Sequence, residues 1–186
     1  WGCIPSKSLL RNAEVLNLVK DAEKFGISFD NLSYDFGKAI DRSRQVVRRL
    51  TTGVGYLLKK NNVEHIEGSA TFIDAHTIQI GTTTGENRTV SAENIIIATG
   101  ARQREIPTLP IDHNIVITSR DALEMKEIPN RVVVIGGGAT GAEFSHVYRS
   151  YGSEVTIVEL MDRIVPNEDQ EISEVLDKSF RDQGIE

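Results

Sequence analysis

The sequence predicts a protein of the α/β class. Three observations carry this prediction: helical spacing of apolar residues through the first 60 residues, short strand-like segments between residues 63 and 98, and a strand–helix–strand pattern over Arg131–Glu159. Apolar residues that recur every three or four positions indicate an amphipathic helix, whereas short β-branched runs between turn residues indicate strands. Both element types in one chain are typical of a layered α/β fold.

Composition and charge narrow the classes of partner. The 186 residues carry a formal net charge of −6, with acidic and basic residues interspersed and an ordinary hydrophobic content of 39%. This pattern argues against a nucleic-acid surface, and no apolar run is long enough to span a membrane. The single cysteine excludes an internal disulfide and suits a reducing compartment. We therefore expect a cytoplasmic protein that binds small ligands.

Both ends of the sequence look like internal boundaries. Trp1 is not a methionine, and no basic or signal-like segment follows it. A helical pattern over Asp169–Gln183 ends at Gly184, which would cap the helix before a strand that the sequence does not continue. We expect the chain to be a piece of a longer protein.

The stretch Arg131–Glu159 contains a glycine-rich turn of the type G-x-G-x-x-G. An apolar strand (Val132–Ile135) precedes it, and a helix ending near Gly152 and a second strand (Val155–Val158) follow it. In such a turn one glycine allows a tight bend, one admits a pyrophosphate against the backbone, and one lets the helix pack closely on the strand. Those positions are Gly136, Gly138 and Gly141.

This pattern predicts a dinucleotide site. The helix N-terminus would present unpaired N–H groups and the positive end of its dipole to the phosphates. Glu159 ends the second strand, where a carboxylate accepts hydrogen bonds from the adenosine ribose and repels a 2′-phosphate, so NAD is favoured over NADP. Two alternatives stay open: Glu159 is only a polar strand end, and Arg163 keeps NADP possible.

Two helices are expected before residue 61. The first begins at Pro5 or Ser6, which puts Cys3 just before a helix N-terminus, where the dipole favours a thiolate; a small buried hydrophobe is the alternative. The second runs from Asp35 to about Lys60, with a break or a close contact possible at its two glycines, Gly53 and Gly55. Its basic cluster favours a solvated face over an interaction patch; the cluster is Arg42, Arg44, Arg48 and Arg49.

Short strands follow, as in an antiparallel meander with a hairpin tip at Gly81–Gly85. The predicted strands are Val63–Glu67, Ala70–Ile73, Thr77–Ile80, Thr89–Ser91 and Asn94–Ala98. Then comes a linker (Arg102–Ile117) and a short helix (Asp121–Met125) capped by Ser119. We place a domain boundary here, giving domains 1–117 and 118–186. The four histidines show no metal-ligand spacing, so we expect no metal site.

Several of these segments occur in the order that is typical of one protein family. They are Trp1-Gly-Cys-Ile-Pro-Ser-Lys7, Gly68-x-Ala70-x-Phe72, Ala98-Thr99-Gly100, the glycine turn with Glu143, and Glu159-x-x-Asp162-Arg163-Ile164. Together they resemble the flavin-dependent pyridine nucleotide-disulfide oxidoreductases, most closely the dihydrolipoamide dehydrogenases among them. The resemblance covers essentially the whole chain. It implies two Rossmann-like dinucleotide-binding domains, for FAD and NAD(P), both incomplete here, with the meander inserted in the first.

The resemblance also implies a role for each matching residue. Cys3 matches the cysteine whose thiolate contacts the flavin ring, and Lys7 matches the lysine near the flavin N5. Glu143 matches the glutamate that reaches the nicotinamide and pairs with that lysine; a first-turn carboxylate complementing the helix dipole is the alternative. The FAD-contacting positions would be Ala70, Thr99, Gly100 and Ala101, and the NAD-contacting ones Gly136, Gly137, Gly138, Ala139, Thr140, Gly141, Ala142, Glu143 and Glu159.

The implied reaction passes electrons from dihydrolipoamide through a redox disulfide and FAD to NAD. The implied partners are lipoyl-carrying complexes and a second copy in a homodimer. The partner cysteine five residues before Cys3, the FAD glycine turn and the acid/base histidine of the family are not in this sequence. We therefore expect the chain alone to be inactive. Mercuric reductase, soluble transhydrogenase, glutathione reductase and a nucleotide-binding module without disulfide chemistry remain alternatives.

Overall fold

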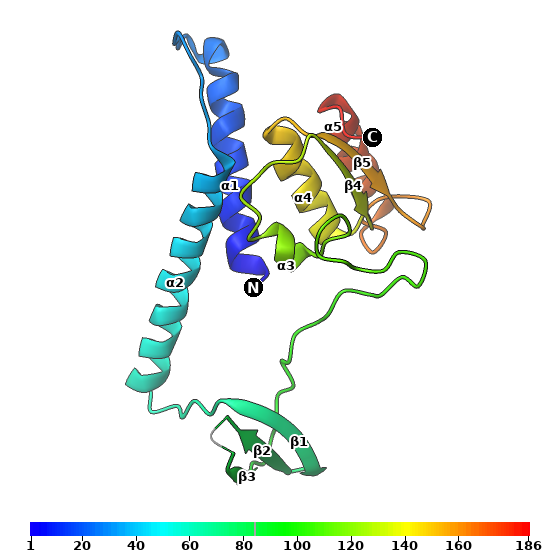
Figure 1. The fold of residues 1–186 in the computed structure, drawn as a ribbon. Coiled ribbons are helices and arrows are strands. Elements are labelled where there is room, and N and C mark those ends of the chain that lie inside the picture. The colour runs from blue at the N-terminus through cyan, green and yellow to red at the C-terminus, as the bar shows by residue number, and fades with distance from the viewer. Residues whose placement is uncertain (84) are drawn as a thin grey trace. The chain divides into compact units, whose positions relative to one another are not determined.

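A computed structural model describes residues 1–83 and 85–186 of the chain. They form two compact units, whose elements are labelled in Figure 1. Unit 1 comprises Trp1–Leu50 and Ile106–Glu186, and unit 2 comprises Thr51–Glu105. The domain boundary that the sequence predicts after residue 117 stays a prediction.

Unit 1 opens with helix α1 (Cys3–Lys20), whose apolar stripe Leu9, Ala13 and Leu16 is buried as the sequence predicts. The helix begins at Cys3, two residues before the expected start, because Pro5 fits the first turn, where no backbone donor is needed. A short 3₁₀ helix, η1 (Ala22–Phe25), follows, and Gly26 ends it in the left-handed region at φ 72°.

Helix α2 (Phe36–Lys60) begins in unit 1 and ends in unit 2. It is continuous through Gly53 and Gly55, and a Cβ at either glycine would meet no heavy atom of the described chain within 4 Å. The break or close contact considered there is therefore absent. The first two turns of α2 supply its buried residues, which are Phe36, Ala39, Ile40 and Ser43.

The basic cluster of α2 is only partly a solvated face. Arg42 Nη1 donates to Ser8 Oγ at 3.0 Å and to Asn12 Oδ1 at 3.1 Å, which ties α2 to α1. The Arg44 side chain is 25% exposed and lies 4.0 Å from the carboxylate of Glu124. These two side chains thus serve packing within unit 1, which a helical-wheel argument could not foresee.

Unit 2 contains a three-stranded antiparallel sheet in the order β1–β2–β3, which confirms the core of the predicted meander. The strands are β1 (Gly68–Asp74), β2 (Thr77–Thr82) and β3 (Asn87–Ser91). Ala70 of β1 stands opposite Ile80 of β2, and Ile80 is the residue of this sheet that is most deeply buried. Thr84, in the predicted hairpin tip, lies outside the described residues.

Two predicted strands of unit 2 are wrong. Residues 63–67 and 94–98 pair with no other strand in the described part of the chain. The side chains of Ile96 and Ile97 are 91% and 69% exposed, so the apolar run that predicted a doubly covered strand has no sheet to join within unit 2. Composition alone indicates a strand but cannot supply its neighbours.

The predicted strand–helix–strand pattern is confirmed in unit 1. β4 (Arg131–Ile135), α4 (Ala139–Ser150) and β5 (Glu154–Val158) follow in order, and the two strands pair in parallel. Gly152, at φ 104°, makes the turn after α4. Helix α5 (Gln170–Asp182) then returns the chain to the sheet, where Ile185 forms a parallel bridge to Val155.

Helix α3 (Ser119–Ala122) is shorter than expected, and its cap is Thr118 instead of Ser119. The Thr118 hydroxyl accepts from the amide of Asp121, and the Asp121 carboxylate accepts from the amide of Thr118. This reciprocal capping box places the carboxylate three positions after the cap, with two residues between them, and Thr118 stands at that spacing from Asp121.

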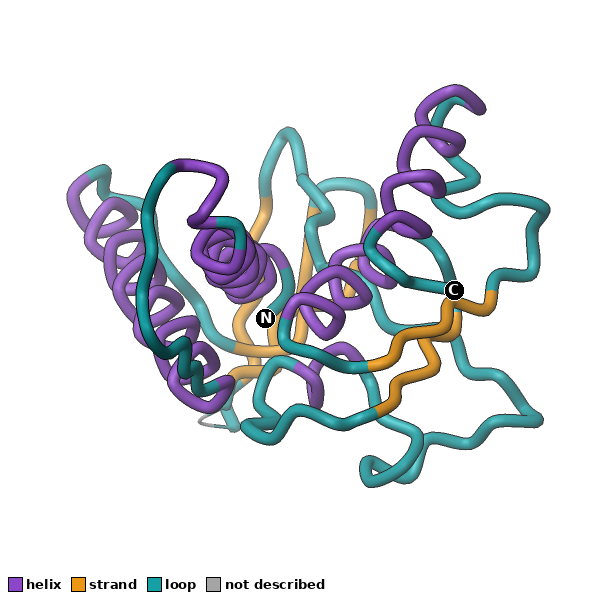
Figure 2. Tube along the Cα trace, turned by 90° about the horizontal axis from the view of Figure 1, so that it is seen from above, coloured by secondary structure: helices purple, strands orange, loops and turns teal. Residues whose placement is uncertain are grey.

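The layers of unit 1 follow from these elements. α4 lies between α1 and the β4–β5 pair, and α5 covers the same face of the two strands (Figure 2). The opposite face is open, with Val133, Ile135 and Val158 exposed. Helices α1 and α4 run parallel, since Lys7 contacts Glu143 and Asn17 Nδ2 donates to Ser150 Oγ at 2.9 Å. Both helix N-termini therefore lie at the same end of the helix pair.

Candidate functional site

The glycine turn joins β4 to α4 in the geometry that a dinucleotide requires. Gly136 has φ 103°, and its amide donates to Val158 O at 2.8 Å, which fixes the turn to β5. A Cβ on Gly141 would lie 1.9 Å from Gly136 O, so only glycine fits there. A Cβ on Gly138, by contrast, would meet no heavy atom of the described residues within 4 Å. The space above Gly138 is therefore open for a phosphate group.

The N-terminus of α4 faces the same open space. The first backbone bond of the helix runs from Ala142 N to Gly138 O at 2.9 Å. The N–H groups of Ala139, Thr140 and Gly141 precede it and have no partner in the helix ladder. Gly138, Ala139 and Thr140 are exposed, while Gly137 and Ala142 are buried behind them. Free donors at a helix N-terminus favour an anion.

Glu159 lies directly beside this turn. Its Oε2 accepts from the amide of Gly137 at 2.6 Å, and its Oε1 accepts from the amide of Met161 at 3.0 Å. The Met161 amide, followed by that of Gly137, lowers the pKa of the Glu159 carboxyl and keeps it ionised. The Met161 contact was not foreseen, because a backbone N–H is the same for every residue type and leaves no signal in the sequence.

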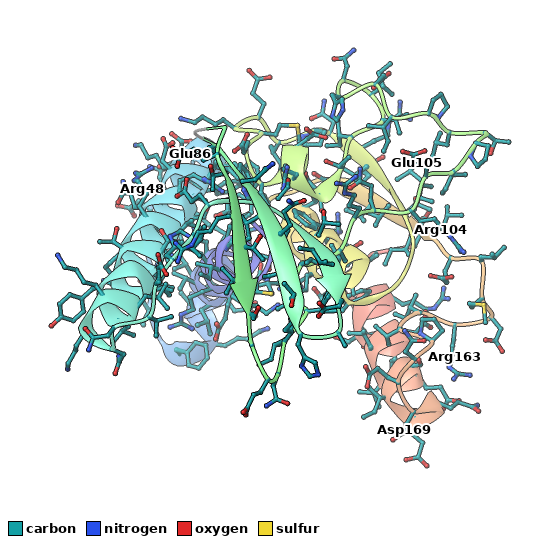
Figure 3. The ribbon with its side chains drawn as sticks, turned by 90° about the horizontal axis from the view of Figure 1, so that it is seen from below. Arg48, Glu86, Arg104, Glu105, Arg163 and Asp169 are labelled. Carbon is teal, nitrogen blue, oxygen red and sulfur yellow. The ribbon has the colours of Figure 1, made fainter. Side chains whose placement is uncertain are left out.

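Arg163, which left NADP open in the sequence, makes its polar contacts within its own loop. Its Nη2 donates to Pro166 O at 3.2 Å, and its Nη1 lies 4.0 Å from Asp162. Figure 3 shows Arg163 in the loop that follows β5 and Asp169 next to α5. No ion pair joins its guanidinium to Glu159 among the described residues.

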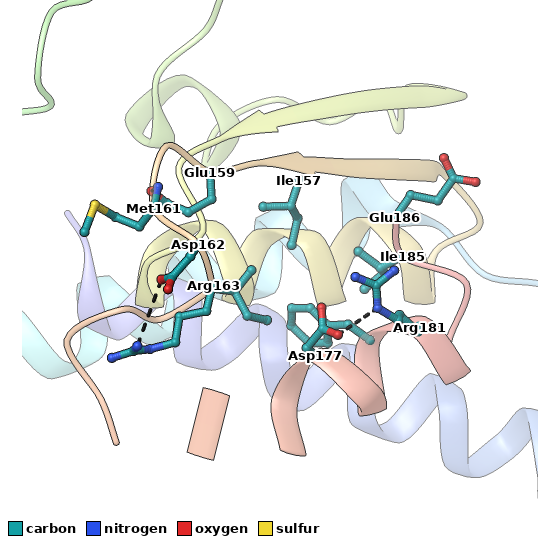
Figure 4. A pocket seen from close by; sticks show the side chains of 11 residues that line it. Ile157, Glu159, Met161, Asp162, Arg163, Asp177, Arg181, Ile185 and Glu186 are labelled. Atoms are coloured by element: carbon teal, nitrogen blue, oxygen red, sulfur yellow. Dashed lines mark hydrogen bonds and ion pairs between the residues drawn. The ribbon is translucent and has the colours of Figure 1, made fainter. Parts of the chain in front are cut away.

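A cavity of about 160 Å³ lies between this loop and α5 (Figure 4). Glu159, Met161 and Arg163 line it from the loop, Ile157 from β5, and Arg181 from α5, where Nε binds Asp177 Oδ2 at 2.7 Å. A second cavity, of about 300 Å³, shares Arg163 and Arg181. Together the two cavities extend from Glu159 along α5.

Lys7 of α1 and Glu143 of α4 form an ion pair. The Lys7 side chain is 61% exposed and that of Glu143 25% exposed, so the pair lies at the surface where the two helices meet. The structure thereby joins two predicted site residues that stand 136 positions apart. Cys3, one turn before Lys7, is a free and exposed thiol at the first residue of α1.

The predicted FAD positions lie in the other unit. Ala70 is in β1, and Thr99, Gly100 and Ala101 follow the run that does not form a strand. All four are exposed, and Gly100 adopts the left-handed region at φ 80°. Cys3, Lys7, the glycine turn, Glu143 and Glu159 all belong to unit 1. Their assignment to FAD and NAD stays a prediction.

Among residues 1–83 and 85–186, no group of three His, Cys, Asp or Glu side chains is arranged to hold a metal ion. None of the described helices has the length and apolar character needed to cross a membrane.

Comparison with known proteins agrees with this geometry. The family model of the pyridine nucleotide-disulphide oxidoreductases matches residues 1–186. The dihydrolipoyl dehydrogenase of Chlorobaculum tepidum is 47% identical over 185 residues, which cover 100% of this chain and 39% of that relative. The dihydrolipoyl dehydrogenase of Mycobacterium tuberculosis is 42% identical over 185 residues, covering 99% of this chain and 39% of the relative.

Solved structures give the same result. LpdA from Mycobacterium tuberculosis superposes with a TM-score of 0.86 at 26% identity, covering 99% of this chain and 40% of that one. The HOCl-induced flavoprotein disulfide reductase RclA from Escherichia coli superposes with a TM-score of 0.71 at 31% identity, covering 100% and 38%. The chain thus spans about two fifths of the length of its relatives. It belongs to the pyridine nucleotide-disulphide oxidoreductase family, and the predicted α/β class with its Rossmann-like dinucleotide-binding fold is confirmed.

Proposed function

We propose that this chain is a segment of an NAD-linked flavoprotein disulfide reductase that oxidises dihydrolipoamide. The observation that carries the proposal is the Lys7–Glu143 ion pair, which joins the helix of Cys3 to the helix behind the glycine turn. The dihydrolipoyl dehydrogenases of Chlorobaculum tepidum and Mycobacterium tuberculosis, 47% and 42% identical, support the substrate. Mercuric reductase, glutathione reductase and soluble transhydrogenase are the alternatives within the family.

Unit 1 would hold the pyridine nucleotide. The open space at Gly138 fits a pyrophosphate, and the free amides of Ala139, Thr140 and Gly141 would bind its oxygens. The ionised Glu159 would accept from the ribose hydroxyls and repel a 2′-phosphate, which favours NAD over NADP. Arg163 donates through Nη2 to Pro166 O within its own loop, so that donor is already engaged, which supports the same choice.

FAD, when bound, would supply the transfer of electrons between the disulfide and NAD. Within unit 2, Ala70, Thr99, Gly100 and Ala101 would contact it, and the left-handed Gly100 would let the backbone approach closely. Cys3 would be the thiol beside it, on the exposed first turn of α1. Glu143 would hold the Lys7 ammonium at the boundary between the flavin and nicotinamide positions.

The proposal also covers the partners, the oligomeric state and the cellular location of the protein. A dihydrolipoamide substrate implies lipoyl-carrying complexes as partners. We also propose a homodimer in the cytoplasm, where a reducing environment keeps Cys3 competent for dithiol exchange.

The second candidate is a nucleotide-binding module in which Cys3 is inert. It is favoured by one observation: the nucleotide turn and Glu159 lie wholly within unit 1, whereas the chain holds a single cysteine. Absorbance spectroscopy of the longer protein separates the two. Under our proposal flavin co-purifies, and two-electron reduction produces a long-wavelength band from a thiolate beside the flavin that Cys3→Ser abolishes. A flavin-free protein, or a band indifferent to Cys3→Ser, establishes the second candidate.

A further inference from the structure

Trp1 is held by two arginines that come from different helices. The Arg44 Cζ of α2 lies 4.9 Å from the centroid of the Trp1 ring, and the Arg120 Cζ of α3 lies 4.5 Å from it. Both distances are within the range of a cation–π contact, and Trp is the strongest ring for this interaction. Residues far apart in the sequence thus converge on the segment that leads into Cys3.

Neither contact follows from simple burial of an apolar ring. Trp1 remains 59% exposed, so the guanidinium groups contact it at the surface of unit 1. Arg44 Nη1 is buried and has no hydrogen-bond partner among the described residues, and its nearest carboxylate, on Glu124, is 4.0 Å away. The ring therefore provides a substantial part of the electrostatic environment of Arg44.

The start of α1 needs such support. Gly2 precedes the helix, and no side chain of the described residues caps it. The first turn rests on a 3.2 Å bond from Ser6 N to Gly2 O and a 3.3 Å bond from Ser6 Oγ to Cys3 O. Because Gly2 has no side-chain acceptor, the first amides of this turn, which carries the thiol, have no capping hydrogen bond from the N-cap side chain.

We propose that Trp1 is a positioning residue for Cys3: its contacts with Arg44 and Arg120 fasten the residues that lead into α1 to α2 and α3, and so hold the first turn of α1 and its thiol in place. The proposal rests on the proposed function only in treating Cys3 as the redox thiol. An exposed cation–π contact corresponds to about a threefold change in an equilibrium constant. Loss of the ring should therefore raise the frayed population of the first turn by about threefold or more.

The chain is suited to a direct test, because it contains one cysteine and one tryptophan. Alkylation with N-ethylmaleimide reports on Cys3 alone, and Trp fluorescence reports on Trp1 alone. Trp1→Leu keeps an apolar side chain without a π face, whereas Trp1→Phe keeps the face. Cys3 is already exposed, so fraying does not unmask it and only takes it away from the positive end of the helix dipole, where thiols react faster. We therefore expect alkylation of Cys3 to be up to about threefold slower in Trp1→Leu than in the unaltered chain. Trp1→Phe should restore most of the original rate.

The arginines are tested through fluorescence. Arg120→Gln should increase acrylamide quenching of Trp1, and Arg44→Gln should do the same. Arg11→Gln is the matched control, because Arg11 lies on α1 itself but pairs with Glu14 at 2.7 Å. It should leave both the quenching and the Cys3 alkylation rate unchanged.

A further readout addresses the thiol geometry. In the flavin-loaded longer protein, Trp1→Leu should weaken the thiolate–flavin absorbance band, and Trp1→Phe should restore it. Equal alkylation rates in the Leu, Phe and unaltered chains, or unchanged quenching in Arg120→Gln, would overturn the positioning role. The alkylation and quenching measurements need no flavin, so a missing band would count against the proposed function alone.

Discussion

Lys7 on α1 and Glu143 on α4 form an ion pair across two parallel helices. Cys3 lies one turn before Lys7, and the glycine turn lies one turn before Glu143, so the pair connects the thiol end of one helix to the nucleotide end of the other. The Lys7 side chain is 61% exposed, and exposed ion pairs contribute little to stability. The main effect of the contact is therefore to fix the positions of the two helix ends relative to each other.

Glu143→Gln separates these two roles. The amide keeps the shape of the side chain and removes its charge. The free energy of unfolding, measured by urea denaturation of the chain, should fall by less than about 1 kcal/mol. In the longer protein the NAD-linked rate should fall by about tenfold or more, since Lys7 would lose its anionic partner.

The control is Glu14→Gln, which removes a carboxylate that is 57% exposed, against 25% for Glu143, from the Arg11 pair on α1. It should leave both quantities near their original values. If Glu143→Gln left the NAD-linked kinetics unaltered, the pair with Lys7 would serve only to join α1 to α4; Glu143 lies beyond the first turn of α4, so the alternative of complementing the helix dipole is not supported.

The glycine turn yields a prediction in which two similar substitutions have opposite consequences. Gly141→Ala would place a Cβ 1.9 Å from Gly136 O, a backbone atom that cannot move without opening the turn. We expect a loss of about 2 kcal/mol or more in the free energy of unfolding. NAD binding should be lost with the turn.

Gly138→Ala should spare the fold and impair the site. Gly138 has φ −70°, which alanine accepts, and its Cβ would enter open space. The free energy of unfolding should change by less than about 1 kcal/mol. NAD affinity, measured by calorimetry, should fall by about tenfold because the methyl group occupies the space for the pyrophosphate. Undiminished NAD binding by this variant would place the phosphates elsewhere.

The glycine turn was also the element that the sequence predicted best. Strand, turn, helix and second strand are contiguous, and each glycine at this turn has a local steric reason that a pattern can express. The helix of Cys3 was predicted from the periodicity of Leu9, Ala13 and Leu16 for the same reason. Local geometry is readable where all the interacting atoms are close in the sequence.

The features that the sequence did not predict depend instead on residues that are far apart in the sequence. The run Ile95–Ala98 has the composition of a central strand, but a strand exists only with neighbours, and none of the described residues pairs with it. Arg42 bonds to Ser8 and Asn12 on another helix, and Arg44 contacts Trp1, so their charge on α2 did not disclose their partners. The Lys7–Glu143 pair was expected only through the family resemblance, because periodicity cannot relate positions 136 residues apart.

Asp121 gives a prediction for acid unfolding. The amide of Thr118, then its hydroxyl, and more weakly His113 lower the pKa of Asp121 from 3.8 to about 2. Because the folded-state pKa lies below the unfolded one, ionised Asp121 stabilises the fold above pH 3.8. This contribution decreases as the pH falls from 3.8 through about 2.

Asp121→Asn should remove that pH dependence. Urea denaturation at several pH values should show the variant less stable than the unaltered chain at neutral pH, with the difference closing toward pH 2. Thr118→Val keeps the amide donor and removes the hydroxyl, so it should have an intermediate effect. If the difference in the free energy of unfolding between Asp121→Asn and the unaltered chain did not change with pH, the ionised carboxylate would make no such contribution.

The last prediction concerns the end of α5, where Gly184 passes the chain from helix to sheet. Gly184 has φ 75° and Gly26, after η1, has φ 72°, so alanine at either site costs about 1 kcal/mol in backbone conformation. A Cβ on Gly26 would meet no heavy atom of the described chain within 4 Å, which makes Gly26→Ala the control for the conformational cost alone.

At Gly184 the Cβ would lie 2.8 Å from Arg149 Nη2. That guanidinium has little freedom to move, since its Nε donates to Gln183 O at 2.6 Å and its Nη1 to Ser153 O at 3.3 Å. Displacing it would also disturb the buried Ile185, which bridges to Val155 of β5. Gly184→Ala should therefore lower the free energy of unfolding by at least about 1 kcal/mol more than Gly26→Ala, measured by urea denaturation. Equal losses at the two glycines would mean that Arg149 yields freely and does not fasten the end of α5 to α4.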